Sequence, residues 1–304
     1  HKDIFRPAKY NKCELYNDND ELLITGTLLR TQFRSSVYSG WTRVAGYTTT
    51  GVLEDCEIPL QCYPLQTNRL TLLENCQRIC KPFGINVVVD ASVQEKANQK
   101  ITKTTASESQ SAKDYLAELC ASRQILLSHT NKGELLLTQA NTKQDPIYYF
   151  NGPSKGFAFT LDINGQGMHS EIGALRQARK RAGGGTIGQT VINNPYVSVF
   201  RTAVKKQTSG DNNADTNTTA RNILSDELKS IVLTIEIEDF YLNGLFVKPG
   251  QLISITNPEL YIFSPTSFFI ESVKYKQNSN ENTATLTCYL PEVYNNETPK
   301  NIFL

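Results

Sequence analysis

The stretch LLENCQRICKPFGINVVVD (residues 72–90) marks a change from strand-like to helical sequence in this chain. Apolar residues recur in its first half at intervals of three and four, which predicts a helix with one apolar face. That face comprises Leu72, Leu73, Cys76, Ile79, Cys80 and Phe83. Pro82 and Gly84 predict the end of the helix, and the β-branched run INVVVD (85–90) predicts a strand directly after it.

A second helix and a hairpin follow this strand. Thr105 and Glu108 have the spacing of a capping box, which predicts the start of a helix near 109–123. Asn131-Lys132-Gly133 suits left-handed turn geometry and predicts a hairpin. The order helix, strand, helix and hairpin therefore predicts a small α/β domain over residues 68–140.

The sequence on the N-terminal side of this domain is strand-like. The run LLITGTLLR (22–30) predicts a strand interrupted at Gly26, and residues 37–44 predict a second strand. Short runs of this kind, separated by glycine and polar clusters, are typical of a small antiparallel barrel or sheet.

The sequence on the C-terminal side returns to strands. Residues 156–163 and 197–204 predict two of them, and residues 218–230 predict a helix with one apolar face. In IVLTIEIE (231–238) apolar and polar residues alternate, which predicts a strand with one buried face. Three more such strands follow, at 251–256, 267–275 and 283–290, and together they predict a small barrel or sandwich.

These patterns together predict an α+β fold that is mostly β. We expect two tube-like antiparallel β-barrel domains with a small α/β domain inserted. The expected segments are 1–67 (the first part of an N-terminal tube-like β-domain), 68–140 (the α/β domain), 141–206 (the continuation of the β-domain, with a glycine-rich loop) and 207–304 (a helix and the C-terminal β-barrel domain).

The composition excludes several classes of protein. The 304 residues include 31 Lys and Arg against 30 Asp and Glu, a net charge of +1 that argues against bulk electrostatic binding of nucleic acid. Runs of apolar residues are too short to predict a membrane-spanning helix.

The seven cysteines are an odd number without CxxC spacing, which favours buried thiols in a reducing compartment over a zinc or disulfide framework. Because the chain opens at His1 and its one methionine is Met168, we expect N-terminal residues to be missing.

A basic, glycine-rich stretch between residues 176 and 188 contains the chain's most distinctive motif. Gly183, Gly185 and Gly188 match GxGxxG, but the preceding residues are not a strand and the following ones are not a helix, so a loop is expected instead of a dinucleotide site. Beside it lie four cations: Arg176, Arg179, Lys180 and Arg181. Three interpretations of these cations stay open: a solvated loop, a phosphate-facing patch in a channel, or a contact with a protein partner.

Catalytic and metal motifs are not found. Three widely spaced histidines include no HExxH, and there is no GxSxG around a serine. Two carboxylate pairs, Asp55/Glu57 and Glu236/Glu238, have the i, i+2 spacing of one exposed strand face, which a glycosidase site does not require. The sequence therefore predicts a structural or binding protein, not an enzyme, with no cofactor and no metal site.

Five segments in fixed order extend over nearly the whole chain. They are residues 23–56 ending in VLEDC, 70–88 with PFGI, 109–138, 161–172 with MHSE, and 220–291 with NGLF. In this order they resemble the baseplate hub proteins of contractile-tailed bacteriophages, in particular the Mu-type hub and late-control D proteins. Met168-His169 stands where that family usually carries Arg followed by an aromatic residue.

The resemblance implies a virion protein of the tail baseplate, made in the bacterial host cytoplasm. It implies a homotrimer whose two barrel domains per subunit form a pseudo-hexameric ring between a hexameric tail tube and a trimeric central spike. The implied partners are a second and third copy, the tail tube protein, the spike or needle protein, and baseplate wedge and tape-measure proteins. DNA would pass through the ring only in transit, during ejection into the host cell.

Three alternatives stay open from the sequence. A hub-like component of a bacterial contractile injection system would also be a trimer. A tail-associated cell-wall hydrolase would need an acid and a nucleophile facing a cleft, which the motifs do not supply. An oligonucleotide-binding barrel is disfavoured by the neutral net charge.

Overall fold

The computed structural model describes residues 3, 5–177, 186–206, 216–278 and 281–304. These residues divide into two compact units, one within residues 1–139 and one from residue 140 onward. Over the two units together strand exceeds helix, so the predicted α+β, mostly β class is confirmed. Among the described residues no helix has the length and apolarity needed to cross a membrane.

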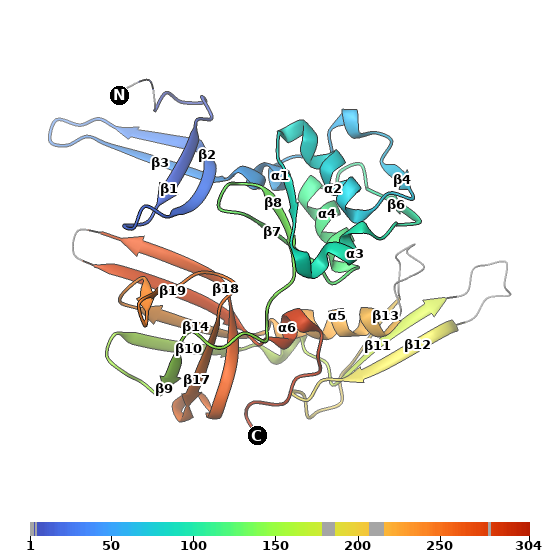
Figure 1. Cartoon of the computed structure of the whole chain (residues 1–304). Helices are drawn as coiled ribbons and strands as arrows, with labels where there is room; N and C mark the ends of the chain where they lie inside the picture. Colours follow the sequence, from blue (N-terminus) through green and yellow to red (C-terminus); the bar gives the residue numbers. More distant parts are fainter. Residues whose placement is uncertain (1–2, 4, 178–185, 207–215, 279–280) are drawn as a thin grey trace. The chain divides into compact units, whose positions relative to one another are not determined.

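The first unit begins with a three-stranded antiparallel sheet in the order β1-β2-β3 (Figure 1). The strands are β1 (Lys12–Tyr16), β2 (Leu22–Arg34) and β3 (Trp41–Thr48). Gly26 does not interrupt β2 as predicted, because the crossing of β3 needs a residue without a side chain there. A Cβ on Gly26 would lie 2.1 Å from the Tyr47 carbonyl oxygen, and one on Gly46 would lie 2.2 Å from that of Thr27. Val37 and Tyr38 lie in the β2–β3 turn and not in the predicted strand.

The predicted helix of the α/β domain is α2 (Leu72–Cys80), and it is continued by a 3-10 turn to Phe83. Gly84 ends it with a positive φ of 67°, which glycine adopts without strain. The capping box lies at the start of this helix: the Glu74 N–H donates to the Thr71 hydroxyl, and the Thr71 N–H donates to the Glu74 carboxylate. Thr71 is therefore the helix N-cap that the sequence analysis did not identify.

The second predicted helix is α4 (Ala112–Ala121), and its start differs from the prediction. Ser111 is its N-cap and accepts a hydrogen bond from the Asp114 N–H. Thr105 instead ends a strand, β6 (Lys103–Thr105), which pairs with β4 (Gln66–Asn68) and so cannot cap a helix. In the first unit two short helices were not predicted: α1 (Val52–Asp55) and α3 (Gln94–Asn98).

A mixed three-stranded sheet completes the α/β domain, in the order β5-β8-β7. Strands β7 (Leu126–His129) and β8 (Leu135–Thr138) form the predicted hairpin, and β5 (Val87–Val89) pairs with β8 in parallel. Helices α2 and α4 pack with these strands around a core whose fully buried members include Leu72, Ile79, Leu116 and Leu137.

The second unit is built on a six-stranded sheet that curls into a half-barrel (Figure 1). Its order is β10-β14-β19-β18-β17-β9, and only the pair β17–β9 is parallel. The strands are β9 (Tyr149–Asn151), β10 (Phe157–Ile163), β14 (Ile231–Ile237), β17 (Leu252–Asn257), β18 (Ile262–Gln277) and β19 (Asn282–Tyr289). A small hairpin of β15 (Tyr241–Leu242) and β16 (Leu245–Phe246) turns at Asn243-Gly244, as predicted.

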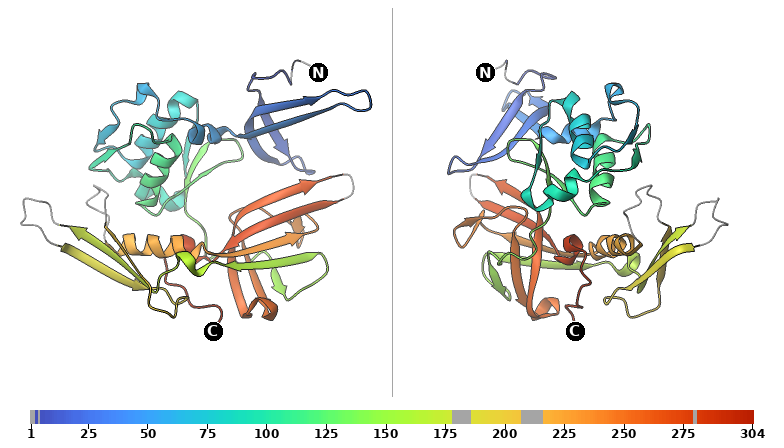
Figure 2. Two further views of the ribbon diagram at one scale, coloured as in Figure 1. Left: turned by 180° about the vertical axis from the view of Figure 1, so that it is seen from behind. Right: turned by 45° about the vertical axis from the view of Figure 1, so that its right-hand side comes forward.

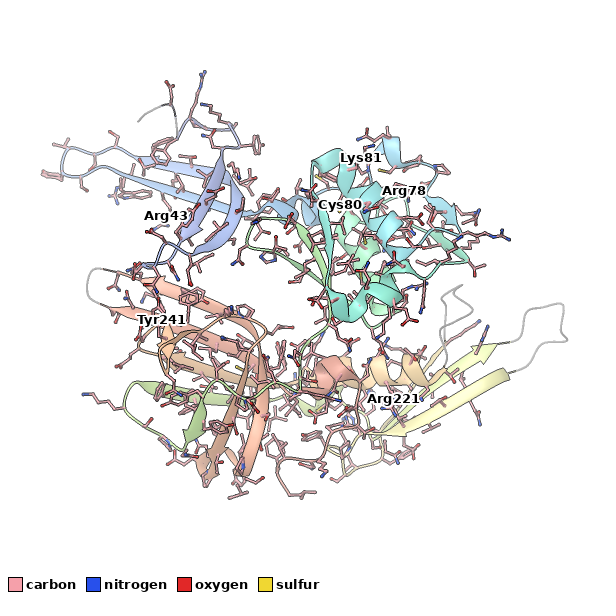
Figure 3. The ribbon with its side chains drawn as sticks, in the orientation of Figure 1. Arg43, Arg78, Cys80, Lys81, Arg221 and Tyr241 are labelled. Atoms are coloured by element: carbon pink, nitrogen blue, oxygen red, sulfur yellow. The ribbon has the colours of Figure 1, made fainter. Side chains whose placement is uncertain are left out.

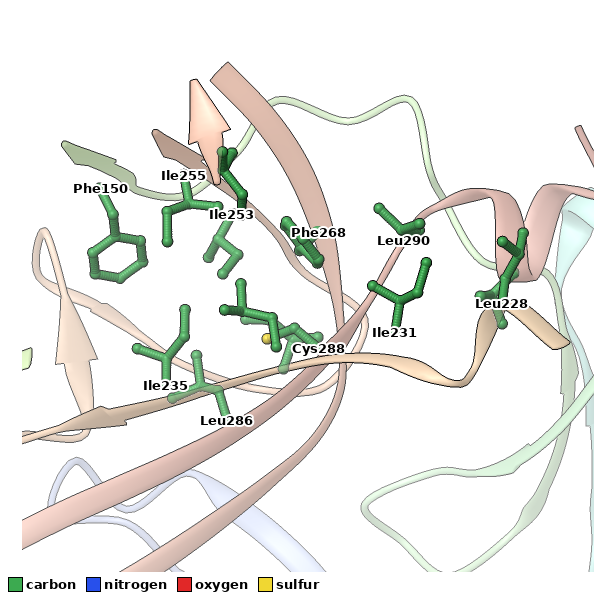
Figure 4. Close-up of a cluster of buried hydrophobic side chains, with 14 of the residues drawn as sticks. Phe150, Leu228, Ile231, Ile235, Ile253, Ile255, Phe268, Leu286, Cys288 and Leu290 are labelled. Carbon is green, nitrogen blue, oxygen red and sulfur yellow. The ribbon is translucent and has the colours of Figure 1, made fainter. Parts of the chain in front are cut away.

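The concave face of this sheet is the largest core of the chain (Figure 4). The predicted alternation in β14 is confirmed: Ile231, Leu233, Ile235 and Ile237 are at most 1% exposed. Apolar side chains of β17, β18 and β19 face them, and the short helix α6 (Glu292–Asn295) closes one end. Burial of this kind contributes about 1.5–3 kcal/mol per large apolar side chain.

A second sheet in this unit has the order β12-β11-β13. Strands β11 (Glu171–Gln177) and β12 (Thr186–Asn193) are antiparallel, whereas β13 (Thr202–Lys206) runs parallel to β11. Residues 197–200, predicted as strand, lie before β13 without strand structure. Helix α5 (Thr216–Leu228) lies along this sheet (Figure 2), with Ala220, Leu224 and Leu228 buried as its sequence predicts.

Candidate assembly surfaces

The sheet β1–β3 has almost no core of its own. Of the residues in its three strands, only Thr25 and Gly26 are buried. Large apolar side chains that a folded domain usually covers are exposed on it: Leu15, Tyr16, Leu29, Phe33, Trp41 and Val44. At the turn between β2 and β3, Val37 is 96% and Tyr38 is 98% exposed. Exposed apolar side chains gathered on one sheet make it a candidate interaction surface.

The outer half of β2 and β3 forms a hairpin, residues 30–45, with two different faces. The register pairs Arg30 with Ala45, Gln32 with Arg43 and Arg34 with Trp41, so three arginines share one face. The guanidinium carbon of Arg43 (Figure 3) lies 5.4 Å from the centre of the Trp41 ring. Phe33 and Val44 occupy the opposite face with Thr31 and Thr42. We call the first the basic face and the second the neutral face.

A hollow of ≈ 800 Å³ lies in the second unit, where β10 begins and β14 ends. Its charged lining residues are Glu236, Glu238, Asp239, Lys276 and Glu281. Glu236 lies between Ala158 and Thr285 in the register, on the sheet face opposite the core. The i, i+2 pair Glu236/Glu238 therefore occupies one exposed face, as predicted, and we call this region the acidic hollow.

The other carboxylate pair is not on a strand. Asp55 is the last residue of α1, and Glu57 follows it in an isolated bridge to Ser111. The prediction of strand context for this pair was wrong because Leu53 anchors a short helix in the core of the α/β domain.

The basic cluster named from the sequence is only partly within the described residues. Arg176 lies near the end of β11, opposite Gly188 of β12. Arg179, Lys180 and Arg181 lie outside the described residues, as do Gly183 and Gly185. The residues around Thr190 form strand β12 and not the helix that a dinucleotide fingerprint requires, as predicted.

The MHSE segment (168–171) joins α5 to the sheet β12–β11–β13. The Glu227 carboxylate, 9% exposed, accepts a hydrogen bond from the His169 N–H at 2.9 Å. The second oxygen of that carboxylate lies 2.7 Å from His169 Nδ1. Met168 is buried beside them at 2% exposure. The departure from the family pattern at Met168-His169 is therefore a packed contact inside the unit, which the sequence analysis did not foresee.

The seven cysteines are all free, and five are buried: Cys62, Cys76, Cys80, Cys120 and Cys288. Burial raises the pKa of the Cys80 thiol to about 12. A hydrogen bond with Cys120, and then burial, hold the pKa of Cys76 well above its ordinary value. Protonated buried thiols behave as small apolar side chains, so the interpretation of these five as core residues is confirmed. Among the described residues no group of three or more His, Cys, Asp and Glu side chains is placed to hold a metal ion.

Known proteins similar to this chain come from bacteriophage tails and related secretion machinery. Residues 50–139 match the family model for the second domain of gp44-like baseplate hub proteins. No curated protein sequence matches the chain.

Solved structures are similar over nearly its whole length. A tail protein from Neisseria meningitidis is 17% identical, with a TM-score of 0.79 over 96% of this chain and 87% of its own. The 43 kDa tail protein of prophage MuSo2 from Shewanella oneidensis is 19% identical, with a TM-score of 0.77 over 95% of this chain and 85% of its own. An Escherichia coli component of the type VI secretion system is 9% identical, with a TM-score of 0.52 over 96% of this chain and 67% of its own.

The family match covers the α/β domain together with α1, and the structural matches extend the same fold over both units. These findings agree with the resemblance drawn from the five ordered segments of the sequence. Residues 50–139 match the second domain of gp44-like baseplate hub proteins, and the recognition of this chain as similar to bacteriophage tail and baseplate hub proteins is confirmed.

Proposed function

We propose that this chain is a structural subunit of a tail baseplate hub that works as a homotrimer. The observation that carries the proposal is the sheet β1–β3, whose strands bury only Thr25 and Gly26 and leave large apolar side chains exposed. A sheet with so little core and two free edges gains stability only when another surface covers it. A closed ring of copies supplies such a surface at every subunit.

In this proposal the two strand-rich parts of each subunit become tube-like barrels on assembly. Three subunits then form a pseudo-hexameric ring that adapts a hexameric tail tube to a trimeric spike. The expected segments 1–67, 68–140, 141–206 and 207–304 remain our proposed division. Within it, β9 and β10 of the third segment share one sheet with strands of the fourth.

The ring would enclose a channel through which DNA passes during ejection. The cluster of Arg176, Arg179, Lys180 and Arg181 is our candidate for the basic segment that faces the DNA phosphates. A small basic cluster suits transit better than a continuous basic surface, because many phosphate contacts would hold the DNA tightly. The proposed partners are the tail tube protein, the spike or needle protein, and the wedge and tape-measure proteins.

The proposal is tested by the mass of the purified full chain in solution and by electron microscopy of the same sample. We expect three times the monomer mass and ring-shaped particles. A protein that stays monomeric up to high micromolar concentration would contradict the proposal. Charge reversal of Arg179, Lys180 and Arg181 tests the channel separately: unchanged assembly with reduced DNA delivery supports it, and unchanged delivery refutes it.

A bacterial contractile injection system is the second candidate setting. The supporting observation is the fold shared with the Escherichia coli secretion-system component, whose description likens it to the T4 tail proteins gp27 and gp5. The two settings differ in the spike that the hub receives. Co-purification of the tagged chain from its own host, followed by identification of the bound spike, separates a virion spike from a secreted one.

We propose that the hub role is non-enzymatic. The supporting comparison is with two solved structures that are described as tail proteins. Release of soluble fragments from purified peptidoglycan measures the alternative directly. Turnover that disappears in a Glu236→Gln, Glu238→Gln variant would contradict our proposal and support a tail-associated hydrolase.

A further inference from the structure

We propose that the basic face of the β2–β3 hairpin of one copy docks onto the acidic hollow of a second copy. This inference rests on the proposed homotrimer and names one of its contacts. The hairpin comes from the first unit and the hollow from the second, so each copy offers both halves of the contact.

The charge of the hairpin is one-sided. Residues 28–46 contain Arg30, Arg34 and Arg43 and no Asp or Glu. The strand register places all three arginines on the face that also carries Trp41. Among the ion pairs of the described residues, none involves these arginines. Three exposed cations without an anionic neighbour are available to an acidic partner.

The hollow has the opposite charge. Its four carboxylates, on Glu236, Glu238, Asp239 and Glu281, face one ammonium, on Lys276, which leaves a net charge of −3. Lys276 is already engaged by Glu281 at 3.3 Å. Glu236, Glu238 and Asp239 are in no ion pair within the described part of the chain. The net charges of hairpin and hollow are therefore equal and opposite.

Shape and backbone chemistry support the same contact. Val37 and Tyr38 project at the tip of the hairpin, and the hollow of ≈ 800 Å³ is large enough to receive such a tip. Within the described residues both surfaces also end in a strand at the edge of its sheet: β3 in the sheet β1–β3 and β10 in the six-stranded sheet. Exposed strand edges favour the addition of a further strand, and charge complementarity fixes which edge is chosen.

A second copy is the occupant that these surfaces favour. A contact between different surfaces of identical chains is heterologous, and when its rotation closes it produces a ring. The same contact repeated at every subunit covers each exposed hairpin once. An anionic polymer such as DNA would satisfy the arginines but would leave the acidic hollow uncovered, so it explains only one of the two surfaces.

Charge reversal in the full chain tests the contact. The hairpin variant is Arg30→Glu, Arg34→Glu, Arg43→Glu; the hollow variant is Glu236→Lys, Glu238→Lys; a third chain combines both sets. We expect each separate variant to weaken trimer formation at least about tenfold, because like charges then face each other, and the combined chain to recover most of the loss. The control Lys81→Glu, Lys103→Glu, Lys132→Glu makes the same charge change at exposed lysines of the α/β domain and should leave the trimer intact.

Cross-linking between different chains tests the position. Tyr38→Cys is made in one chain and Thr283→Cys, at the hollow, in a second chain of different mass. After mixing and mild oxidation we expect the hetero-linked product, at several times the yield obtained with the parent chain as one partner. A disulfide that forms only within a chain carrying both cysteines would overturn the inference, since the hairpin would then dock on its own chain.

The outcomes separate this inference from the proposed function. A monomeric parent protein refutes the homotrimer and the contact together. A parent trimer that all reversal variants retain refutes the contact alone. Loss of single-stranded or duplex DNA binding in the hairpin variant, with assembly unchanged, would assign the basic face to nucleic acid and also overturn the contact.

Discussion

The chain contains two β-sheets of opposite character: the six-stranded sheet of the second unit and the sheet β1–β3 of the first. In β14 every second residue is buried, whereas β1 and β3 contain no buried residue at all. Both sheets are rich in apolar and β-branched residues. The difference teaches that hydrophobic content alone does not indicate where the core lies, because one sheet buries its apolar side chains and the other exposes them, in our proposal for a partner.

The largest effect is expected from the core of the six-stranded sheet. Ile235→Ala removes a fully buried side chain and should lower the free energy of unfolding by about 2–5 kcal/mol. Thr234→Ala, on the other face of the same strand, is the control and should cost less than about 1 kcal/mol. Urea unfolding followed by circular dichroism measures both. Equal losses of unfolding free energy in the two variants would contradict the assignment of one buried and one exposed face to β14.

The matching change in the other sheet should act on assembly instead of folding. Phe33→Ser, on the neutral face of the hairpin, removes apolar area that we expect to be covered only in the trimer, with a loss of about 1.5–3 kcal/mol of association energy. The unfolding of the dissociated chain should stay unchanged. Sedimentation measures the association, and the emission of Trp41, the only tryptophan, reports the hairpin directly. A destabilised monomer with normal association would contradict the comparison.

A smaller effect is expected where the second unit depends on a buried polar contact. Glu227→Gln keeps the size of the side chain but removes the charge that faces His169 Nδ1 at 2.7 Å. Because hydrogen bonds to charged groups contribute about 1.5–3 kcal/mol, we expect a loss at the lower end of that range. Thermal unfolding measures it, with Asp226→Asn, at an exposed neighbouring site, as the control. A variant as stable as the parent would show that α5 is held by its apolar face alone.

The smallest loss of stability is expected from a substitution in the α/β domain. Thr71→Ala removes the N-cap of α2 and should cost about 1 kcal/mol. Hydrogen bonds from the Thr71 N–H and hydroxyl hold the pKa of Glu74 below its ordinary value of 4.5. Because its pKa is lowered in the folded state, the ionised Glu74 carboxylate stabilises the fold fully above pH 4.5. This stabilisation is lost as the pH falls through the lowered pKa. Unfolding at pH 7 and at acid pH, in the parent and in Glu74→Gln, checks the sign: the parent should lose more on acidification.

Much of the fold follows from local patterns. The alternation in residues 231–238 and the helical spacing from Leu72 predict β14 and α2, because each pattern reflects one buried face. Gly26 was misinterpreted because the backbone of β3 passes too close to it to leave room for a side chain. That part of β3 lies about twenty positions further along the sequence, so no local pattern shows the contact. Thr105 was misinterpreted because strand pairing with β4 overrides a local capping signal.

The candidate surfaces were harder to predict than the core. The i, i+4 spacing of Arg30 and Arg34, which places both on one face of a strand, is visible in the sequence, but Arg43 joins their face only through the register of β2 and β3. The acidic hollow likewise combines residues that are far apart in the sequence: 156–158, 236–239, Lys276, 281–283 and Thr285. Surfaces made by pairing distant strands leave no local signal, whereas the basic cluster at 176–181 is conspicuous because it is contiguous.

The central claim is that the sheet β1–β3 is completed only by assembly, and hydrogen exchange tests it most directly. Amide exchange is measured on the full chain at protein concentrations above and below the one at which the trimer dissociates. We predict that residues 30–45 exchange fast in the monomer and slowly in the trimer, while the amides of Ile231–Ile237 stay slow in both. Equal protection of residues 30–45 in monomer and trimer would contradict the account.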